Sequence, residues 1–224
     1  CIYNRGVDMH QTPYVHRMFR DVFTGIDTRQ KKAIPINELH TLLNEDPQSD
    51  KLRRTQAIAN LLFLFCGMPF VDLAHLRKSD LKDGYLTLRR RKTGMPLSAR
   101  VDSRAMQLLE RYRNRDDTSP YLLCFLDGSL EGMAAYRDYL RILRLLNSKL
   151  RALALWRKVP GKVTSYTARH TWATAGKYCH VPIEIISEGL GHASVTTTEG
   201  YMKGFGNSRM DRANKVIMNY IFES

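Results

Sequence analysis

A single apolar run constrains this fold more than any other feature of the sequence. From Thr55 to Phe65 the residues are almost wholly apolar. A run of this length favours a buried helix over a strand, because strands are usually shorter. The sequence therefore predicts a central helix that anchors the core, with the other elements packed around it.

Shorter periodic segments on both sides of this run predict the rest of the fold. Apolar residues spaced three and four apart indicate helices, and the alternation of polar and apolar residues over 85–89 indicates a strand. The predicted helices lie near 38–43, from Asp102 or Ser103 to Tyr112, over 138–155, 167–178, 182–189 and 209–221, with a short one after Ser194, and the predicted hairpin pairs 85–89 with 95–101. These elements predict a mostly α fold with one small antiparallel β-sheet, in the α+β class.

The composition is that of a soluble globular protein. Of the 224 residues, 43% are hydrophobic, which is enough for a sizeable core. The best candidate for a membrane span, 58–73, is interrupted by Asn60, Gly67 and Asp72, so no spanning helix is predicted. The chain begins at Cys1 without a Met, which indicates a fragment of a longer protein.

Cysteine and histidine spacing argue against a metal site. The four cysteines, at 1, 66, 124 and 179, fit neither a Cys-x-x-Cys metal knuckle nor a dense disulfide framework. The seven histidines show no ligand spacing with cysteine or acidic partners. The sequence predicts no metal and a reducing compartment.

The charge distribution points to a polyanion as the partner. Lys and Arg number 35 against 22 Asp and Glu, a net charge of +13. Nine basic residues and no acidic residue lie between Tyr139 and Ile183. A second stretch without acids, 84–101, carries Arg89, Arg90, Arg91, Lys92 and Arg100. Two basic stretches that flank one core favour contact with nucleic-acid phosphates, the alternative being an ordinary solvated basic face.

Four short motifs follow one another in a recognisable order. Arg-His-Thr at 169–171 is followed by Leu-Gly-His at 190–192, and Tyr201 comes nine residues after His192. Upstream lie Gly-Met-Pro-Phe-Val-Asp-Leu at 67–73 and Lys-Thr-Gly at 92–94. Over about 33–221 this pattern resembles the catalytic domain of the tyrosine recombinases, also called the phage integrase family.

The resemblance is greatest to integrases of bacterial conjugative and mobilisable elements. It implies the DNA breaking-rejoining fold for a catalytic domain at 32–224, which includes a C-terminal helix. It also implies that 1–31 are the end of a core-binding domain with its linker.

The same resemblance implies a role for each motif. Tyr201 would attack a DNA phosphodiester and form a 3′-phosphotyrosyl enzyme with a free 5′-hydroxyl. Arg169 would hold the scissile phosphate with its planar guanidinium, and His192 would hydrogen-bond the same phosphate. Lys92, at the hairpin tip, resembles the lysine that protonates the leaving oxygen. No metal or other cofactor is implied, because the phosphotyrosine conserves the energy of the cleaved bond.

Other residues are expected to support the site. His170 is expected to fix its own helix by hydrogen bonds. The motif at 67–73 resembles the family's first catalytic box, and Asp72 resembles the acid of this first box, which orients neighbouring groups. Gly191 is expected to allow a turn with positive φ. Tyr166 stands where the family usually has His or Lys, so proton transfer is expected to depend more on Lys92 and the histidine at 192.

One position departs further from the family pattern. Pro69 stands where the family's first arginine normally lies, so one of two guanidiniums on the phosphate is missing. Losing one such donor typically lowers the rate by about 10²- to 10³-fold unless another cation replaces it. The candidates for that replacement are Arg53, Arg54 and Arg77.

The sequence thus predicts a site-specific DNA recombinase of the integrase, excisionase or invertase type. The expected partner is double-stranded DNA, and no membrane partner is expected. The chain is expected to be monomeric when free and to form a homotetramer on DNA. The expected location is the cytoplasm of a bacterium, with the nucleoid. The main alternative is a catalytically impaired DNA-binding protein of the same fold, followed by a type IB topoisomerase and, least favoured, a metalloenzyme.

Overall fold

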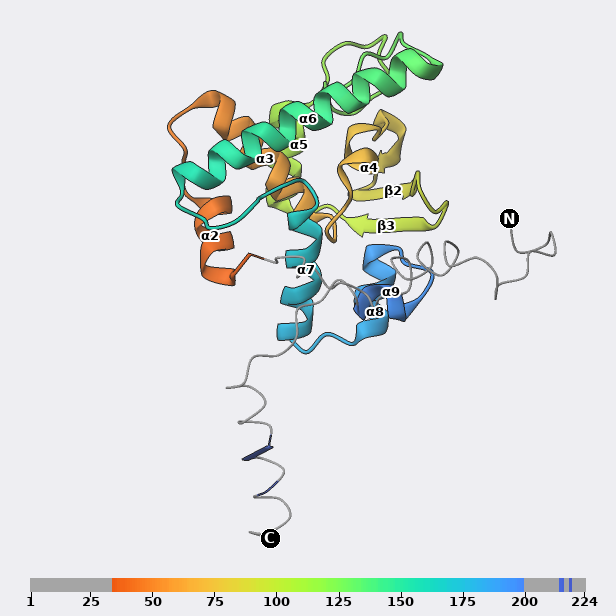
Figure 1. Cartoon of the computed structure of the whole chain (residues 1–224). Helices are drawn as coiled ribbons and strands as arrows, with labels where there is room; N and C mark the ends of the chain where they lie inside the picture. The colour runs from red at the N-terminus through yellow and green to blue at the C-terminus, as the bar shows by residue number, and fades with distance from the viewer. Residues whose placement is uncertain (1–33, 200–213, 216–217, 219–224) are drawn as a thin grey trace, which may run out of the picture. The chain divides into compact units, whose positions relative to one another are not determined.

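The computed structural model describes residues 34–199, 214–215 and 218 (Figure 1). Segment 1–31 and nearly all of 209–221 lie outside these residues, so the domain boundary and the C-terminal helix stay predictions. Within the described part, helices are combined with one three-stranded antiparallel sheet. The α+β class is therefore confirmed.

Helix α3 (Asp50–Leu64) forms the centre of the core, as the apolar run predicts. It is in contact with four other helices: α2 (Ile36–Asn44), α5 (Ser103–Tyr112), α6 (Gly132–Trp156) and α7 (Thr167–Tyr178). Because α3 has neighbours all round, the residues from Ala57 to Leu62 are buried without interruption. The buried Asn60 is satisfied, since its amide donates to the Leu43 carbonyl at 2.9 Å and its side-chain oxygen accepts from Arg104 at 2.7 Å.

The sheet consists of the predicted hairpin and one further strand. Strand β2 (Tyr85–Arg89) pairs antiparallel with β3 (Pro96–Arg100), and β1 (Leu81–Lys82) extends the sheet on the other side of β2. The paired residues Leu86 and Ala99 face the core, while their neighbours along each strand are exposed. Strand β1 was not predicted, because two residues are too few to show an alternating pattern.

Helix α6 begins earlier than predicted, and a further helix, α4, was not predicted. Helix α6 begins at Gly132, six residues before the predicted start at 138. Its first turns expose Met133 and Tyr136, so no buried face marks them in the sequence. The motif at 67–73 contains the short helix α4 (Phe70–Ala74), which begins after Pro69.

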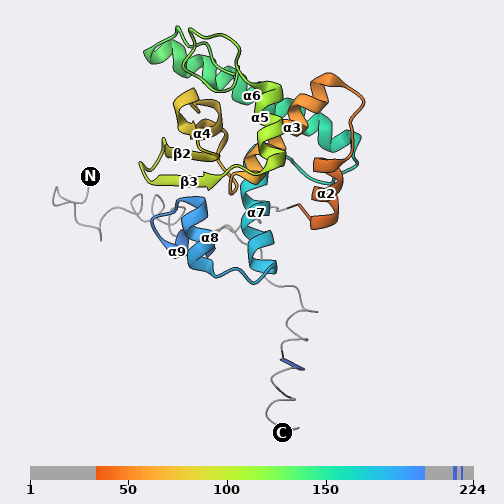
Figure 2. The ribbon, with the colours of Figure 1, turned by 180° about the vertical axis from the view of Figure 1, so that it is seen from behind.

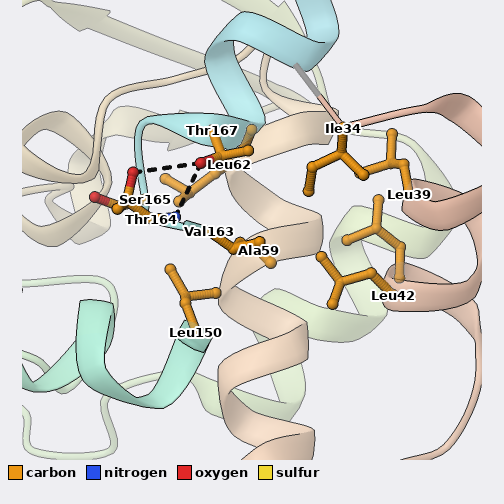
Figure 3. A pocket seen from close by; sticks show the side chains of 12 residues that line it. Ile34, Leu39, Leu42, Ala59, Leu62, Leu150, Val163, Thr164, Ser165 and Thr167 are labelled. Carbon is orange, nitrogen blue, oxygen red and sulfur yellow. Dashed lines mark hydrogen bonds between the residues drawn. The ribbon is translucent and has the colours of Figure 1, made fainter. Parts of the chain in front are cut away.

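The start of α7 is fixed by a short loop against α6. Thr164 donates its backbone N–H to the Thr167 hydroxyl at 2.9 Å (Figure 3). Ser165 donates its own backbone N–H to Asn147 of α6 at 2.8 Å. A cavity of about 20 Å³ lies behind this loop among aliphatic side chains that include Ile34 and Leu150. It has room for about one water molecule, so it is too small for a substrate.

Helices α8 (Ile183–Leu190) and α9 (Val195–Glu199) follow α7 and lie beside β3 in both views (Figures 1 and 2). A second small core of Ala173, Ile186 and Leu190, with Trp172 packed on it, joins α8 to α7. The end of α8 therefore lies close to the hairpin. No helix among the described residues is long and apolar enough to cross a membrane.

Candidate functional site

Arg169 is the centre of the candidate site. Its side chain lies on α7 and is only 4% exposed. Nη1 donates to the carbonyl of Gly67 at 3.0 Å, and Nη2 contacts both the carbonyl of Leu190 and Nε2 of His192, the latter at 2.9 Å. One guanidinium thus joins three of the four motifs that the sequence analysis placed in order.

Gly67 is required by this close approach. It has φ +63°, in the left-handed region, and a Cβ there would lie 2.9 Å from the Cα of Arg169. Its carbonyl could not reach the guanidinium if the backbone were pushed back by a side chain. Gly67 is therefore needed for the close contact between its own backbone and Arg169 of α7.

His192 is neutral in this arrangement. An arginine can only donate, so Nε2 of His192 accepts from Arg169, and the remaining ring nitrogen, Nδ1, carries the proton and donates to the Thr198 hydroxyl at 2.9 Å. Burial, together with the positive charges of Arg169, Arg90 and Lys92, lowers the pKa of His192 to about 4. Thr198, which is fully buried on α9, was not singled out by the sequence analysis.

The hairpin brings two cations to this site. Lys92 is exposed in the turn between β2 and β3, near enough to lower the pKa of His192. Arg90, at the start of the same turn, is 3% exposed and donates from Nη2 to the carbonyl of Gly189 at 2.7 Å. The sequence analysis noted Arg90 only as part of a basic stretch, because nothing in a run of four cations tells which one turns inward.

Asp72 holds the start of the hairpin turn. It lies on α4 and is 2% exposed. Its Oδ1 accepts from the backbone N–H of Arg91 at 2.9 Å, and its Oδ2 lies 3.6 Å from Nη1 of Arg90. The expected orienting role of this carboxylate is therefore directed at the hairpin.

Tyr166 and His170 form one face at the start of α7. His170 is buried, and its ring makes an edge contact with that of Tyr166, with centroids 5.2 Å apart. Tyr166 itself is 41% exposed. The pair packs one turn of α7 beside the candidate site.

Of the three cations expected to replace the first arginine, two have partners elsewhere and the third is exposed. Arg53 binds Asp46 and Asp50, and Arg54 donates to the carbonyl of Cys124. Arg77 is exposed at the start of the 3-10 helix η2 (Lys78–Asp80), where its backbone N–H bonds to Asp80. None of these contacts leads to the candidate site.

Two further predictions have different outcomes. Tyr201 lies outside the described residues, so its role as nucleophile stays a prediction. Gly191 has φ +63° at the C-terminus of α8, which confirms the expected left-handed turn. No group of three or more possible metal ligands occurs within the part of the chain that the structure describes.

Comparison with known proteins decides the family. Residues 32–206 match the model of the phage integrase family. The chain belongs to the phage integrase family. Among its relatives, the tyrosine recombinase XerA of Pyrococcus furiosus is 29% identical over 175 residues, which are 77% of this chain and 57% of the relative. The XerA of Pyrococcus horikoshii is 26% identical over 199 residues, which are 81% of this chain and 64% of the relative.

Solved structures of other family members share the fold. A crystal structure of a XerA recombinase superposes with a TM-score of 0.59 at 24% identity, covering 81% of this chain and 63% of that one. A XerH recombinase bound to palindromic difH DNA gives 0.62 at 18% identity, covering 83% and 53%. The Tn1549 integrase bound to circular intermediate DNA gives 0.57 at 17%, covering 85% and 68%. The chain thus spans less than two thirds of the length of the XerA relatives.

The close packing at Gly191 leads to a first prediction. A Cβ at this glycine would lie 2.1 Å from Nε of Arg90, whereas a Cβ at Gly94, which has φ +68°, meets nothing within 4 Å. Gly94→Ala should lower the free energy of unfolding by about 1–2 kcal/mol, the usual penalty of the left-handed conformation. Gly191→Ala should lower it by more, because Arg90 must also move. Urea unfolding of both variants measures the difference, and equal losses would contradict the contact.

The neutral His192 leads to a second prediction. Its folded pKa, about 4, lies below the unfolded value near 6.5, so the unfolded state binds more protons between these pH values. The stability of the DNA-free protein should therefore fall as the pH falls from about 6.5 to about 4, and less so in His192→Asn. Imidazole NMR should show the Nδ1–H tautomer at pH 7. A cationic ring at pH 6 would contradict it.

Proposed function

We propose that this chain is the catalytic domain of a site-specific DNA recombinase that cuts and rejoins DNA through a 3′-phosphotyrosyl intermediate at Tyr201. The observation that carries the proposal is the buried Arg169, held by the carbonyl of Gly67 and in contact with His192. Gly67, Arg169 and His192 belong to motifs that lie far apart in the sequence. Their contact is what we expect if these motifs form one site. Family membership and the names of the relatives support the same reaction.

The partner in this proposal is double-stranded DNA. The net charge of +13 favours a polyanion, and the solved XerH and Tn1549 structures of the same fold contain DNA. Following the family resemblance, the working assembly would be a homotetramer on two duplexes, formed from a chain that is monomeric when free.

Each site residue has one task in this reaction. Tyr201 attacks the phosphorus, and Arg169 donates to the non-bridging oxygens as negative charge develops on them. His192 completes the contacts to the phosphate. Lys92, exposed at the hairpin tip, delivers the proton to the leaving 5′-oxygen. The reaction needs no high-energy cofactor, because bond energy is conserved in the phosphotyrosine, and the donors to the non-bridging oxygens do the work that a metal would otherwise do.

Covalent trapping tests the nucleophile. The purified protein is mixed with nicked duplexes from the two flanks of its gene, quenched in detergent and separated on a denaturing gel. An adduct is expected for the unchanged protein and for Tyr136→Phe, which alters an exposed tyrosine of α6, but not for Tyr201→Phe. Salt-sensitive DNA binding without any adduct would favour the catalytically impaired DNA-binding protein instead. Relaxation of supercoiled DNA without a specific site would favour the topoisomerase.

The same assay tests the proton donor. Lys92→Ala should reduce adduct formation by about 10²-fold or more, the usual contribution of general acid catalysis, while DNA affinity stays close to unchanged. Lys82→Ala is the matched control, because this lysine is exposed on β1 of the same sheet. Full activity of the Lys92 variant would move the acid role to another group.

A further inference from the structure

Arg90 is a buried cation that the proposed function leaves without a task. It lies directly after β2 and is 3% exposed, although it sits in a run of exposed basic residues. Burial lowers its pKa to about 10, and the positive charge of Arg169 is the next largest cause. An arginine so placed is unfavourable in isolation, since charged groups are rarely buried unless something compensates the charge.

The contacts of Arg90 fix its position but use only part of its donors. Nη2 is bonded to Gly189, and Nη1 lies 3.6 Å from the Asp72 carboxylate, beyond hydrogen-bond distance. Neither Nε nor Nη1 has a hydrogen-bond acceptor in the described part of the chain. Buried donors without acceptors indicate that a group is missing from the site. Because Nε and Nη1 of Arg90 can only donate, the missing group must be a hydrogen-bond acceptor.

The charges around the site indicate that the missing group is an anion. Arg90 and Arg169 are both buried there, and His192 between them and α9 is neutral. Asp72 is the carboxylate that acts on Arg90, and it is shared with the backbone of Arg91. Two guanidiniums against one carboxylate leave a net positive charge in a buried place. A phosphate would compensate it with two acceptor oxygens.

Resting on the proposed function, we propose that Arg90 is a catalytic residue that supplies the second guanidinium on the scissile phosphate, in place of the arginine absent at Pro69. The first box then contributes through Asp72, which lies three residues after Pro69 and pairs with Arg90. The cation comes from the hairpin, and the carboxylate that orients it comes from α4.

The chemistry uses both guanidiniums at the same moment. A bond forms between Oη of Tyr201 and phosphorus, and the bond from phosphorus to the 5′-oxygen breaks. The phenol gives its proton to water, and the leaving oxygen gains one from Lys92. Between these events the non-bridging oxygens carry one more negative charge than in the diester. Arg90 donates to these oxygens from the hairpin and Arg169 from α7.

The first test measures cleavage by Arg90→Gln and Arg90→Lys in the trapping assay. Arg90→Gln should slow adduct formation by about 10²- to 10³-fold, as is typical when one donor to the developing charge is lost. Arg90→Lys, which keeps a charge for Asp72, should recover part of that loss. Arg113→Gln, which alters an exposed arginine paired with Glu110, should change the rate little. An Arg90→Gln variant that cleaves like the unchanged protein would overturn the proposal.

A second substrate separates chemistry from folding. When a methyl group replaces one non-bridging oxygen of the scissile phosphate, the diester loses the charge that a guanidinium would contact. On this methylphosphonate DNA, in one of its two stereoisomers, Arg90→Gln should cleave within a few fold of the unchanged protein. If Arg90 only maintained the fold, the variant would stay equally slow on both substrates, and the proposal would be wrong.

A binding measurement keeps the inference testable if the unchanged protein forms no adduct. Calorimetry with inorganic phosphate reports the anion site without any cleavage step. Arg90→Gln and Arg169→Gln should each weaken phosphate binding by about tenfold or more relative to Arg113→Gln. That result without an adduct would refute the recombinase chemistry and keep the anion site of Arg90. Phosphate affinity unchanged by Arg90→Gln would refute the inference itself.

Discussion

The buried guanidinium of Arg169 is the contact on which the rest of the site depends. A charge with 4% exposure must find acceptors within the protein, and it finds them at the ends of two separate segments, the carbonyls of Gly67 and Leu190. These bonds join α7 to the loop before α4 and to the end of α8. Since α7 also packs on the central helix α3, the core fixes the depth of Arg169 and Arg169 fixes the loops. The side chain of Arg169 thus connects the packed core to the loops of the candidate site.

Arg90 and Arg169 fit into the candidate site only because the neighbouring backbone consists of glycines, which have no side chain. Gly67 leaves room for the backbone of Arg169, and Gly191 leaves room for the side chain of Arg90. Both glycines have φ +63°, so each also allows its chain to turn where a side chain would be strained. The first box and the Leu-Gly-His motif therefore carry glycine for packing as well as for turning. The glycines of these motifs are thus required by the two buried arginines that the motifs surround.

The fold was more predictable from the sequence than the site. The apolar run of α3 and the periodicity of α7 are strong local signals, and both were predicted correctly. Strand β1 and the first turns of α6 lack such signals, because one is too short and the other is exposed. In the site, the family resemblance of the ordered motifs brought Arg169 and His192 together. Arg90 could not be found in this way, since the direction of one side chain among adjacent cations depends on Asp72, eighteen residues upstream in the chain.

Thr198 connects the candidate site to the segment that leads to Tyr201. Helix α9 has five residues, and helices this short are not stable alone, so its position depends on what Thr198 contacts. That side chain is fully buried and accepts from Nδ1 of His192, whose Nε2 accepts from Arg169. Nε2 cannot accept from an arginine and donate to a phosphate at once. A hydrogen bond from Nε2 of His192 to the phosphate therefore requires a proton on Nε2, gained by protonation of the ring or by a shift of the proton from Nδ1. An anion beside the two guanidiniums would weaken the positive field that disfavours protonation. The anion that fills the site would then also change the histidine that holds α9.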